Sequence, residues 1–455
     1  MSTISKWTTA LLLLSASAHG QVPSTNDTSD GNSNTGVGEY ALHGPADSNT
    51  GSYNTVVGAS AMFYNTTGGS NTVSGFETLS DNKTGNYNTA SGVWALEYNI
   101  AGSYNTATGY LALQSNDYEG AGVSGNTADG ALALRNNISG TLNTAVGYQA
   151  LYTNVSSGYN TAVGYNALTA NTGSFNSALG ALALAANTSG GANTAFGNSA
   201  LNANQSGANN TATGSNALYM NDTENTGASG NTADGAGAMN NNSSGNNNTA
   251  VGWQTLQGTT SGASGSNNTA IGVNALFAYS TGSNNIAVGY EAGLNVATGS
   301  DNIDIGNAGA AGDNKVIRIG TASTQKKIFI AGINDVSVTG SPVYIASNGQ
   351  LGVVVSSERF KTAIAPMGSN TAKLDKLRPV TFNLKSDATG TRQYGLIAEE
   401  VAKVDPELII RGQYGRIDGV RYDELAPMLL NEMQKHQKNA ATQAAKIAAE
   451  DRRAA

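Results

Sequence analysis

The chain reads Asn143-Thr144-Ala145-Val146-Gly147-Tyr148-Gln149-Ala150-Leu151 and, 17 residues on, Asn160-Thr161-Ala162-Val163-Gly164-Tyr165-Asn166-Ala167-Leu168. The same Asn-led unit recurs over more than half of the 455 residues. Self-similarity at a short fixed period is the signature of a repeat architecture, in which each unit packs mainly on its neighbours. We therefore expect a solenoid over this part of the chain.

The repeats cover residues 34–306 and number sixteen. Their spacing is mostly 17 residues, once 16, and otherwise 20 or 21. The longer spacings contain additional Gly- and Ser-rich residues, which we expect to bulge from one corner. The leading residues are Asn34, Asn54, Asn71, Asn88, Asn105, Asn126, Asn143, Asn160, Asn176, Asn193, Asn210, Asn231, Asn248, Asn268, Asn285 and Asn302.

One unit reads as one coil of a β-roll. Asn-Thr-Ala-Val is a short extended segment whose side chains alternate in direction. The Gly after it permits a tight corner, and a stretch such as 171–174 (Asn-Thr-Gly-Ser) returns the chain. The piece in between, for example 165–168, is compatible with a second short strand or with a helical turn. Stacked coils would align Asn on Asn and Thr on Thr in ladders.

The predicted fold class is mainly β: a repetitive parallel β-roll or solenoid, followed by a small α/β domain with a C-terminal helix. A unit has only about five apolar residues, mostly Ala or Val, so one coil is weak alone. Three parallel coils sharing an axis would remedy this, and we expect a homotrimer. The array resembles the head domains of trimeric autotransporter adhesins, which are left-handed β-rolls with Asn-Ser/Thr-x-Ala/Val-x-Gly coils, although its period is longer.

Charge is scarce and unevenly distributed. The net charge is −8, with 3 Lys/Arg and 16 Asp/Glu up to residue 309 and 20 and 15 from residue 310 onward. Nucleic-acid binding needs clustered Lys and Arg, so the array is not expected to bind nucleic acid. The chain has no Cys, which excludes disulfides and thiolate metal sites. We expect no cofactor and no metal.

Residues 1–20 are predicted to be a secretory signal peptide. Lys6 supplies the only charge, residues 7–14 form a short apolar core, and Ala16-Ser17-Ala18 fits a cleavage site. A membrane anchor is the alternative, but a span needs about 20 apolar residues. Residues 21–33 then form a linker, and we expect a secreted or cell-surface protein without a membrane span after removal of the signal.

Residues 307–355 differ in composition from the repeats. They contain apolar runs typical of strands, at 316–320, 327–332, 343–346 and 351–355. We expect these runs to form strands that close the roll and cap its last coil, because terminal caps are expected of repeat arrays.

The motif Ser356-Ser357-Glu358-Arg359-Phe360-Lys361 opens the only charge-rich segment. A Ser with a Lys nearby can act as nucleophile and base. The Lys must then be neutral, which burial or a cationic neighbour such as Arg359 favours. In a continuous strand the two residues would lie roughly 16 Å apart, so a working dyad needs a bend or a neighbouring chain.

The rest of the C-terminal segment has the pattern of a small α/β domain. Residues 380–384 alternate as a half-buried strand, and a helix around 397–401 ends before Pro406. From Asp423, a candidate N-cap, to about Glu450 the pattern is helical. Its apolar stripe consists of Leu425, Met428, Leu429 and Met433.

Residues 356–455 resemble the S74 peptidase family, the intramolecular chaperone domain of phage tail-fibre and endosialidase proteins. In that family the first Ser of the motif is the nucleophile and the chain is cut on its N-terminal side. The resemblance therefore implies cleavage between Val355 and Ser356, with Lys361 as the base. It also implies a trimer in which the terminal helix takes part. The matching blocks are 356–364, 374–382, 394–401, 405–408 and 422–425.

We weigh two main functions. The first is a trimeric fibre or adhesin-like protein whose C-terminal domain is a chaperone and a single-turnover Ser–Lys endopeptidase, with no substrate in trans. The second is a fibre with a permanent C-terminal cap, in which Ser356 and Lys361 are surface residues. Ser357 as nucleophile and Arg359 as support are lesser options. A polysaccharide-degrading enzyme has no candidate site. The receptor would be a cell-surface glycan or protein.

Overall fold

The computed structural model describes residues 31–43, 49–258, 262–322, 324–330, 342–346, 348–353 and 355–454. It consists of two compact units, one ending at Phe329 and the other beginning at Ile330. The predicted signal peptide and most of the predicted linker lie outside the described residues, and the proposed domain boundaries stay predictions. None of the helices in the described ranges is long and apolar enough to cross a membrane.

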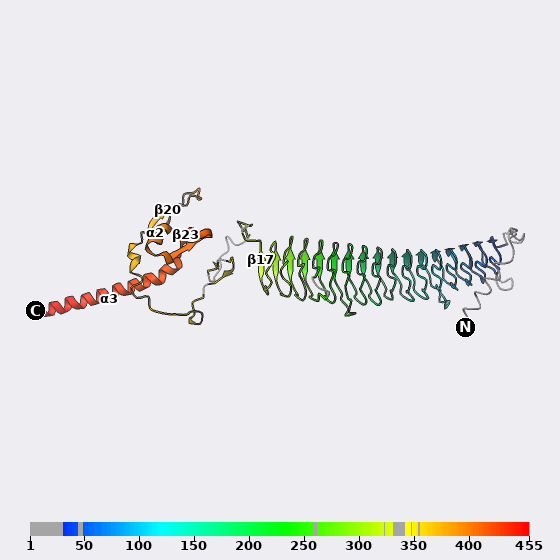
Figure 1. The fold of residues 1–455 in the computed structure, drawn as a ribbon, viewed down its shortest axis with the longest axis horizontal. Coiled ribbons are helices and arrows are strands. Elements are labelled where there is room, and N and C mark those ends of the chain that lie inside the picture. The colour runs from blue at the N-terminus through cyan, green and yellow to red at the C-terminus, as the bar shows by residue number, and fades with distance from the viewer. Residues whose placement is uncertain are drawn as a thin grey trace. The chain divides into compact units, whose positions relative to one another are not determined.

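The repeat array is a parallel β-solenoid, as predicted (Figure 1). Each coil contributes one three-residue strand, and each strand pairs in parallel with the strand of the next coil. The strands are β1 (Thr35–Val37), β2 (Thr55–Val57), β3 (Thr72–Ser74), β4 (Thr89–Ser91), β5 (Thr106–Thr108), β6 (Thr127–Asp129), β7 (Thr144–Val146), β8 (Thr161–Val163), β9 (Ser177–Leu179), β10 (Thr194–Phe196), β11 (Thr211–Thr213), β12 (Thr232–Asp234), β13 (Thr249–Val251), β14 (Thr269–Ile271), β15 (Ile286–Val288), β16 (Ile303–Ile305) and β17 (Ile317–Ile319).

The solenoid core is complete within one chain. In each strand the middle residue points inward and the two flanking residues point outward, as the burial of β5 shows. In the coil that begins at Asn143, Ala145, Ala150 and Leu151 are fully buried. We expected that a weak coil would need two further chains to bury its apolar residues. Instead, the neighbouring coils of the same chain bury them, so burial gives no argument for a trimer here.

Two ladders of buried Asn fill the rest of the interior. The leading Asn143 accepts a hydrogen bond at Oδ1 from the backbone N–H of Asn160 (3.0 Å) and donates through Nδ2 to the Ser157 carbonyl (2.9 Å). A second Asn, eleven residues on, was not predicted: Asn154 Nδ2 donates to Asn137 Oδ1 (3.1 Å) and to the Ser157 carbonyl (2.9 Å). Its fully buried equivalents are Asn65, Asn82, Asn99, Asn116, Asn137, Asn171, Asn187, Asn204, Asn221 and Asn242.

The piece after the Gly corner is neither the strand nor the helical turn that we considered. Gln149 and Leu151 have φ values of 55° and 53°, a left-handed conformation that bulky residues rarely adopt. It is held because the Leu151 side chain is buried and its N–H donates to the Ala167 carbonyl of the next coil (3.0 Å). The same left-handed Leu recurs from coil to coil.

Two coils with 21-residue spacing carry their extra residues at one corner, after Asn116 and Asn221. An Asp anchors each insertion: Asp117 accepts from the N–H groups of Ala101 (2.7 Å) and Gly122 (2.8 Å). Asp222 does the same with Ser206 (2.6 Å) and Gly227 (2.6 Å). Burial raises the pKa of Asp222, but these hydrogen bonds outweigh burial and lower it. The insertions thus leave the stacking undisturbed.

The last two strands have charged residues at their inward positions, and the Arg318 side chain in the final strand is 39 % exposed. Asp304 and Arg318 stand where most other strands have Ala, and Asp304 is only 2 % exposed. Arg318 makes a bidentate ion pair with Asp313 (2.6 and 2.7 Å). Burial, reinforced by the nearby Asp313, raises the pKa of Asp304 to about 6. These residues end the apolar core.

The strands predicted in residues 307–355 are present only in part. Residues 316–320 supply β17, which joins the main sheet. Residues 327–330 form no strand and are exposed, so the strand predicted there is wrong for its described part. β18 (Tyr344–Ile345) and β19 (Leu351–Gly352) form an antiparallel hairpin with each other.

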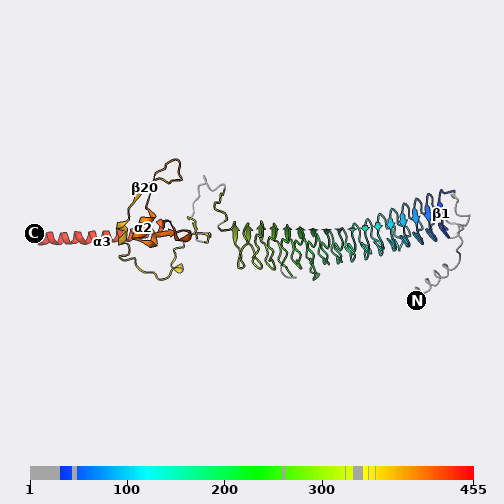
Figure 2. The same cartoon turned by 45° about the horizontal axis from the view of Figure 1, so that its top comes forward.

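The C-terminal unit is a small α/β structure with a long terminal helix, as predicted (Figure 2). The buried cluster consists of Leu374, Val401, Leu408, Ile409 and Val420. The elements are η1 (Glu358–Phe360), η2 (Ala372–Lys376), β20 (Val380–Phe382), β21 (Gln393–Gly395), α2 (Ala398–Val404), η3 (Pro406–Leu408), β22 (Ile409–Arg411), η4 (Gln413–Gly415), β23 (Ile417–Val420) and α3 (Tyr422–Ala454). Strands β20 and β21 pair antiparallel, and so do β22 and β23.

Helix α3 splits the predicted apolar stripe. It begins at Tyr422, so Asp423 lies in the first turn and is not the N-cap. Leu425 and Met428 pack against the buried cluster, whereas Leu429 and Met433 are 57 % and 59 % exposed. The next contacts are polar: buried Thr371 accepts from Asn431 Nδ2 and from Lys435 Nζ (3.1 Å) and donates to Glu432.

Candidate functional site

The candidate site is the Ser-Lys motif at the start of the C-terminal segment. Its centre is η1, a single 3₁₀ turn, and the Lys361 N–H closes the turn by donating to the Glu358 carbonyl (3.0 Å). Ser357 before the turn and Lys361 after it are both extended. The chain therefore bends sharply between Ser356 and Lys361.

The bend brings the two predicted catalytic residues together. Lys361 Nζ donates a hydrogen bond to Ser356 Oγ over 3.1 Å. A continuous strand would hold them roughly 16 Å apart. The bend therefore brings Ser356 and Lys361 together within one chain, and no neighbouring chain is needed for their contact. A nucleophile and a base must be within hydrogen-bond reach, and this pair meets that condition.

The motif is open to solvent. Val355, Ser356 and Lys361 are all exposed, so the predicted scissile bond is accessible. The hydrogen bond has Lys361 as donor, whereas a base must accept the proton of the Ser hydroxyl. A Lys acts as a base only as the neutral amine, a form that burial of the side chain favours.

The supporting residues have other contacts. The guanidinium of Arg359 lies 4.7 Å from the centroid of the Phe360 ring, a cation–π contact. Ser357 precedes η1 but makes no capping hydrogen bond through its side chain. Neither observation assigns Arg359 or Ser357 a role at the Ser356–Lys361 pair.

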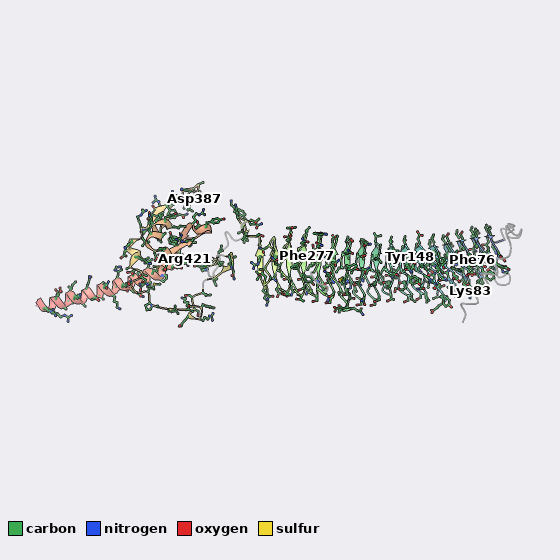
Figure 3. The ribbon with its side chains drawn as sticks, in the orientation of Figure 1. Phe76, Lys83, Tyr148, Phe277, Asp387 and Arg421 are labelled. Atoms are coloured by element: carbon green, nitrogen blue, oxygen red, sulfur yellow. The ribbon has the colours of Figure 1, made fainter. Side chains whose placement is uncertain are left out.

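Other polar clusters of the C-terminal unit have structural explanations (Figure 3). Asp387 accepts hydrogen bonds from Thr389 and Thr391, and these bonds stabilise the loop between β20 and β21. The same hydrogen bonds lower the pKa of Asp387 to about 2. Arg421 pairs with Glu424 in the first turn of α3 (3.0 Å). Within the residues that the structure describes, no three His, Cys, Asp or Glu side chains gather as a metal site would require.

Comparison with known proteins agrees with the position of the motif. Residues 356–410 match the model of the peptidase S74 family, described as chaperone of endosialidase. The match begins at Ser356 and includes Lys361. No curated protein and no solved structure matches the chain.

Proposed function

We propose that this protein is a secreted or surface-exposed trimeric fibre whose C-terminal domain acts as an intramolecular chaperone and then cuts itself off between Val355 and Ser356. The observation that carries the proposal is the 3.1 Å hydrogen bond between Ser356 and Lys361, at the first residues of the family match. The solenoid supplies the fibre. Its receptor would be a cell-surface glycan or protein.

The chemistry needs only these two side chains and water. Ser356 Oγ attacks the carbonyl carbon of Val355 while Lys361 takes up the hydroxyl proton. The C–N bond then breaks, the proton passes to the amine of Ser356, and an ester joins the two residues. Water hydrolyses the ester, which leaves a carboxylate on Val355 and a free hydroxyl on Ser356. Each chain reacts once.

Assembly would provide the switch. In a single chain both Ser356 and Lys361 are exposed to solvent. Packing of neighbouring subunits around the motif would bury the amine and activate the pair only in a correct trimer. Removal of the chaperone would then trap the fibre kinetically, because its assembly template is lost.

The test is the intact mass and N-terminal sequence of protein expressed without residues 1–20. We expect a fragment that begins at Ser356, absent in Ser356→Ala and in Lys361→Met but present in Ser357→Ala. A fragment lost in Ser357→Ala and retained in Ser356→Ala would assign the nucleophile to Ser357.

An uncut chain favours the second function, a fibre with a permanent C-terminal cap. The exposure of both side chains is the observation in its favour. In that case light scattering would show trimers of full-length chains, and Ser356→Ala would change neither chain length nor assembly.

A further inference from the structure

The outward face of the solenoid sheet changes character at its C-terminal end. Strands β1 to β14 begin with Thr, or with Ser in β9, and this residue points outward. The last three strands begin with Ile instead. Their third residue, which also points outward, is Ile or Val, as it is in β1, β2, β7, β8, β13 and β14. The six residues are Ile286, Val288, Ile303, Ile305, Ile317 and Ile319.

These six side chains form one apolar patch, here called the Ile patch. Register places Ile303 opposite Ile317 and Ile305 opposite Ile319, so the residues are direct neighbours across the strands. Ile317 is 65 % exposed and Ile319 is 62 % exposed. Figure 1 shows β17 at the end of the row of coils that carries this patch.

The inward positions of the last two of these strands are charged, whereas β15 has Ala287 there. Asp304 and Arg318 occupy the inward positions of β16 and β17, between outward Ile residues. A shift by one residue would bury the Ile side chains and expose the charges. The chain instead holds apolar side chains in solvent on a rigid frame, and the core gains nothing from them. Such exposed apolar patches mark contact surfaces.

We propose that the Ile patch is the contact at which the solenoid sheets of three copies of this chain meet. The inference rests on the proposed trimer and adds the face that each copy contributes. In parallel copies that are aligned by their C-terminal domains, equivalent strands would lie at the same level along the solenoid axis. The Ile side chains of one copy would therefore contact the same Ile side chains of the others. The six residues carry no charge that would select a different partner.

The area of the face fits this partner. Seventeen strands about 4.8 Å apart make a sheet about 80 Å long, and two columns of side chains cover roughly 10 Å of width. The whole face thus offers about 800 Å² per chain, which is what a stable protein–protein contact buries on each partner. The three strands of the Ile patch supply about 150 Å² of this area. The other strands supply Thr or Ser in the first column and mostly Val, Ser or Thr in the third column, where Asp129 and Asp234 are the charged residues.

The test uses the absence of Cys in this chain. A single Cys is placed by Ile303→Cys in the Ile patch or by Thr298→Cys, an exposed position of a neighbouring coil outside the sheet. Because facing sheets pack about 10 Å apart, a short bis-maleimide should join Ile303→Cys chains into covalent dimers and leave Thr298→Cys chains single. Both variants also carry Ser356→Ala, so that the chains keep one length.

The outcomes separate this inference from the proposed function. Trimers by light scattering without cross-linking of Ile303→Cys would overturn the inference and leave the proposed trimer standing. A monomeric mass overturns both. As a second measurement, Ile286→Thr/Ile303→Thr/Ile317→Thr restores the repeat's own residue and should keep the solenoid folded. We expect subunit exchange at least about tenfold faster in this variant, and an unchanged exchange rate would contradict the proposal.

Discussion

In the solenoid, Ala145, Ala150 and Leu151 are fully buried within one chain, whereas in the C-terminal unit Leu429, Leu430 and Met433 are each more than half exposed. The solenoid stacks each coil on the next and repeats one small core many times. The C-terminal unit has a single cluster of five buried residues and a helix of 33 residues that extends beyond it. The difference teaches that stacked repeats bury a core continuously along the chain, while the C-terminal unit buries one small cluster and leaves apolar side chains of its terminal helix exposed.

The largest expected effect breaks the stacking at a glycine corner. In Gly164→Ala the new Cβ would lie 2.4 Å from the Gly180 carbonyl oxygen, at φ +140°. Strain and overlap together should cost at least about 3 kcal/mol of solenoid stability. The control is Gly122→Ala, where φ is +83° but no atom lies within 4 Å, and it should cost about 1 kcal/mol. Urea unfolding followed by circular dichroism measures both, and equal costs would refute the role of close stacking.

The second effect concerns the Asn ladder. Asn154→Ala removes hydrogen bonds to Asn137 and Ser157 and the hydrogen bond that Asn171 Nδ2 donates to Asn154 (3.3 Å). Since each unmade buried bond costs about 1 kcal/mol, we expect a loss of about 3 kcal/mol. The exposed Asn198→Ala should change stability by less than about 0.5 kcal/mol. If both variants unfold at the same urea concentration, the ladder is not a source of stability.

The third effect is a pH dependence confined to the end of the solenoid. The folded pKa of Asp304, about 6, lies above its ordinary value, so its charged form is disfavoured by folding. Asp304 should therefore make the last coils lose stability as pH rises from the ordinary carboxyl pKa through about 6. Below this window the effect of Asp313 has the opposite sign, because its hydrogen bonds with Arg318 lower its pKa. Asp304→Asn should remove this dependence and stabilise residues 303–320 by about 2 kcal/mol at pH 7.5. Hydrogen exchange, corrected for its intrinsic pH dependence, measures this, and a pH-dependent variant would contradict the assignment.

The smallest effect on stability is expected at the exposed face of α3. Leu429→Lys should change the unfolding free energy of the C-terminal unit by less than about 0.5 kcal/mol, because the side chain is 57 % exposed. It should nevertheless reduce the trimeric fraction seen by light scattering. Met428→Lys is the matched control, because Met428 packs against the buried cluster and its replacement should unfold the unit. A destabilised Leu429→Lys monomer would mean that this face belongs to the fold of a single chain.

The sequence predicted the strands of the solenoid and their register well. Asn-Thr-Ala-Val repeats so regularly that Thr144 could only lie beside Thr161, as it does. The second Asn ladder was not predicted because the residues around Asn154 are typical of an ordinary turn. The left-handed Leu151 escaped because its conformation is unfavourable locally and is selected by the neighbouring coil.

The candidate site was predictable in its residues but not in its geometry. The resemblance pointed to Ser356 and Lys361, yet the pattern of the motif gave no sign of the 3₁₀ turn at Glu358–Phe360 that joins them. Short turns of this kind depend on single backbone hydrogen bonds, which periodicity does not reveal. The strand predicted at 327–332 shows the opposite error, because its apolar run has no partner strand in the part that the structure describes.

The insertions anchored by Asp117 and Asp222 show that the chain can vary in two independent ways, by the number of coils and by the length of a corner loop. Duplication of a 17-residue unit lengthens the solenoid by about 4.8 Å and leaves its surface pattern the same. Extra residues at the anchored corner leave the length the same and add a loop, because the Asp carboxylate takes over the backbone hydrogen bonds there. Reach and surface variety can therefore evolve independently, the first by copying coils and the second by rewriting loops.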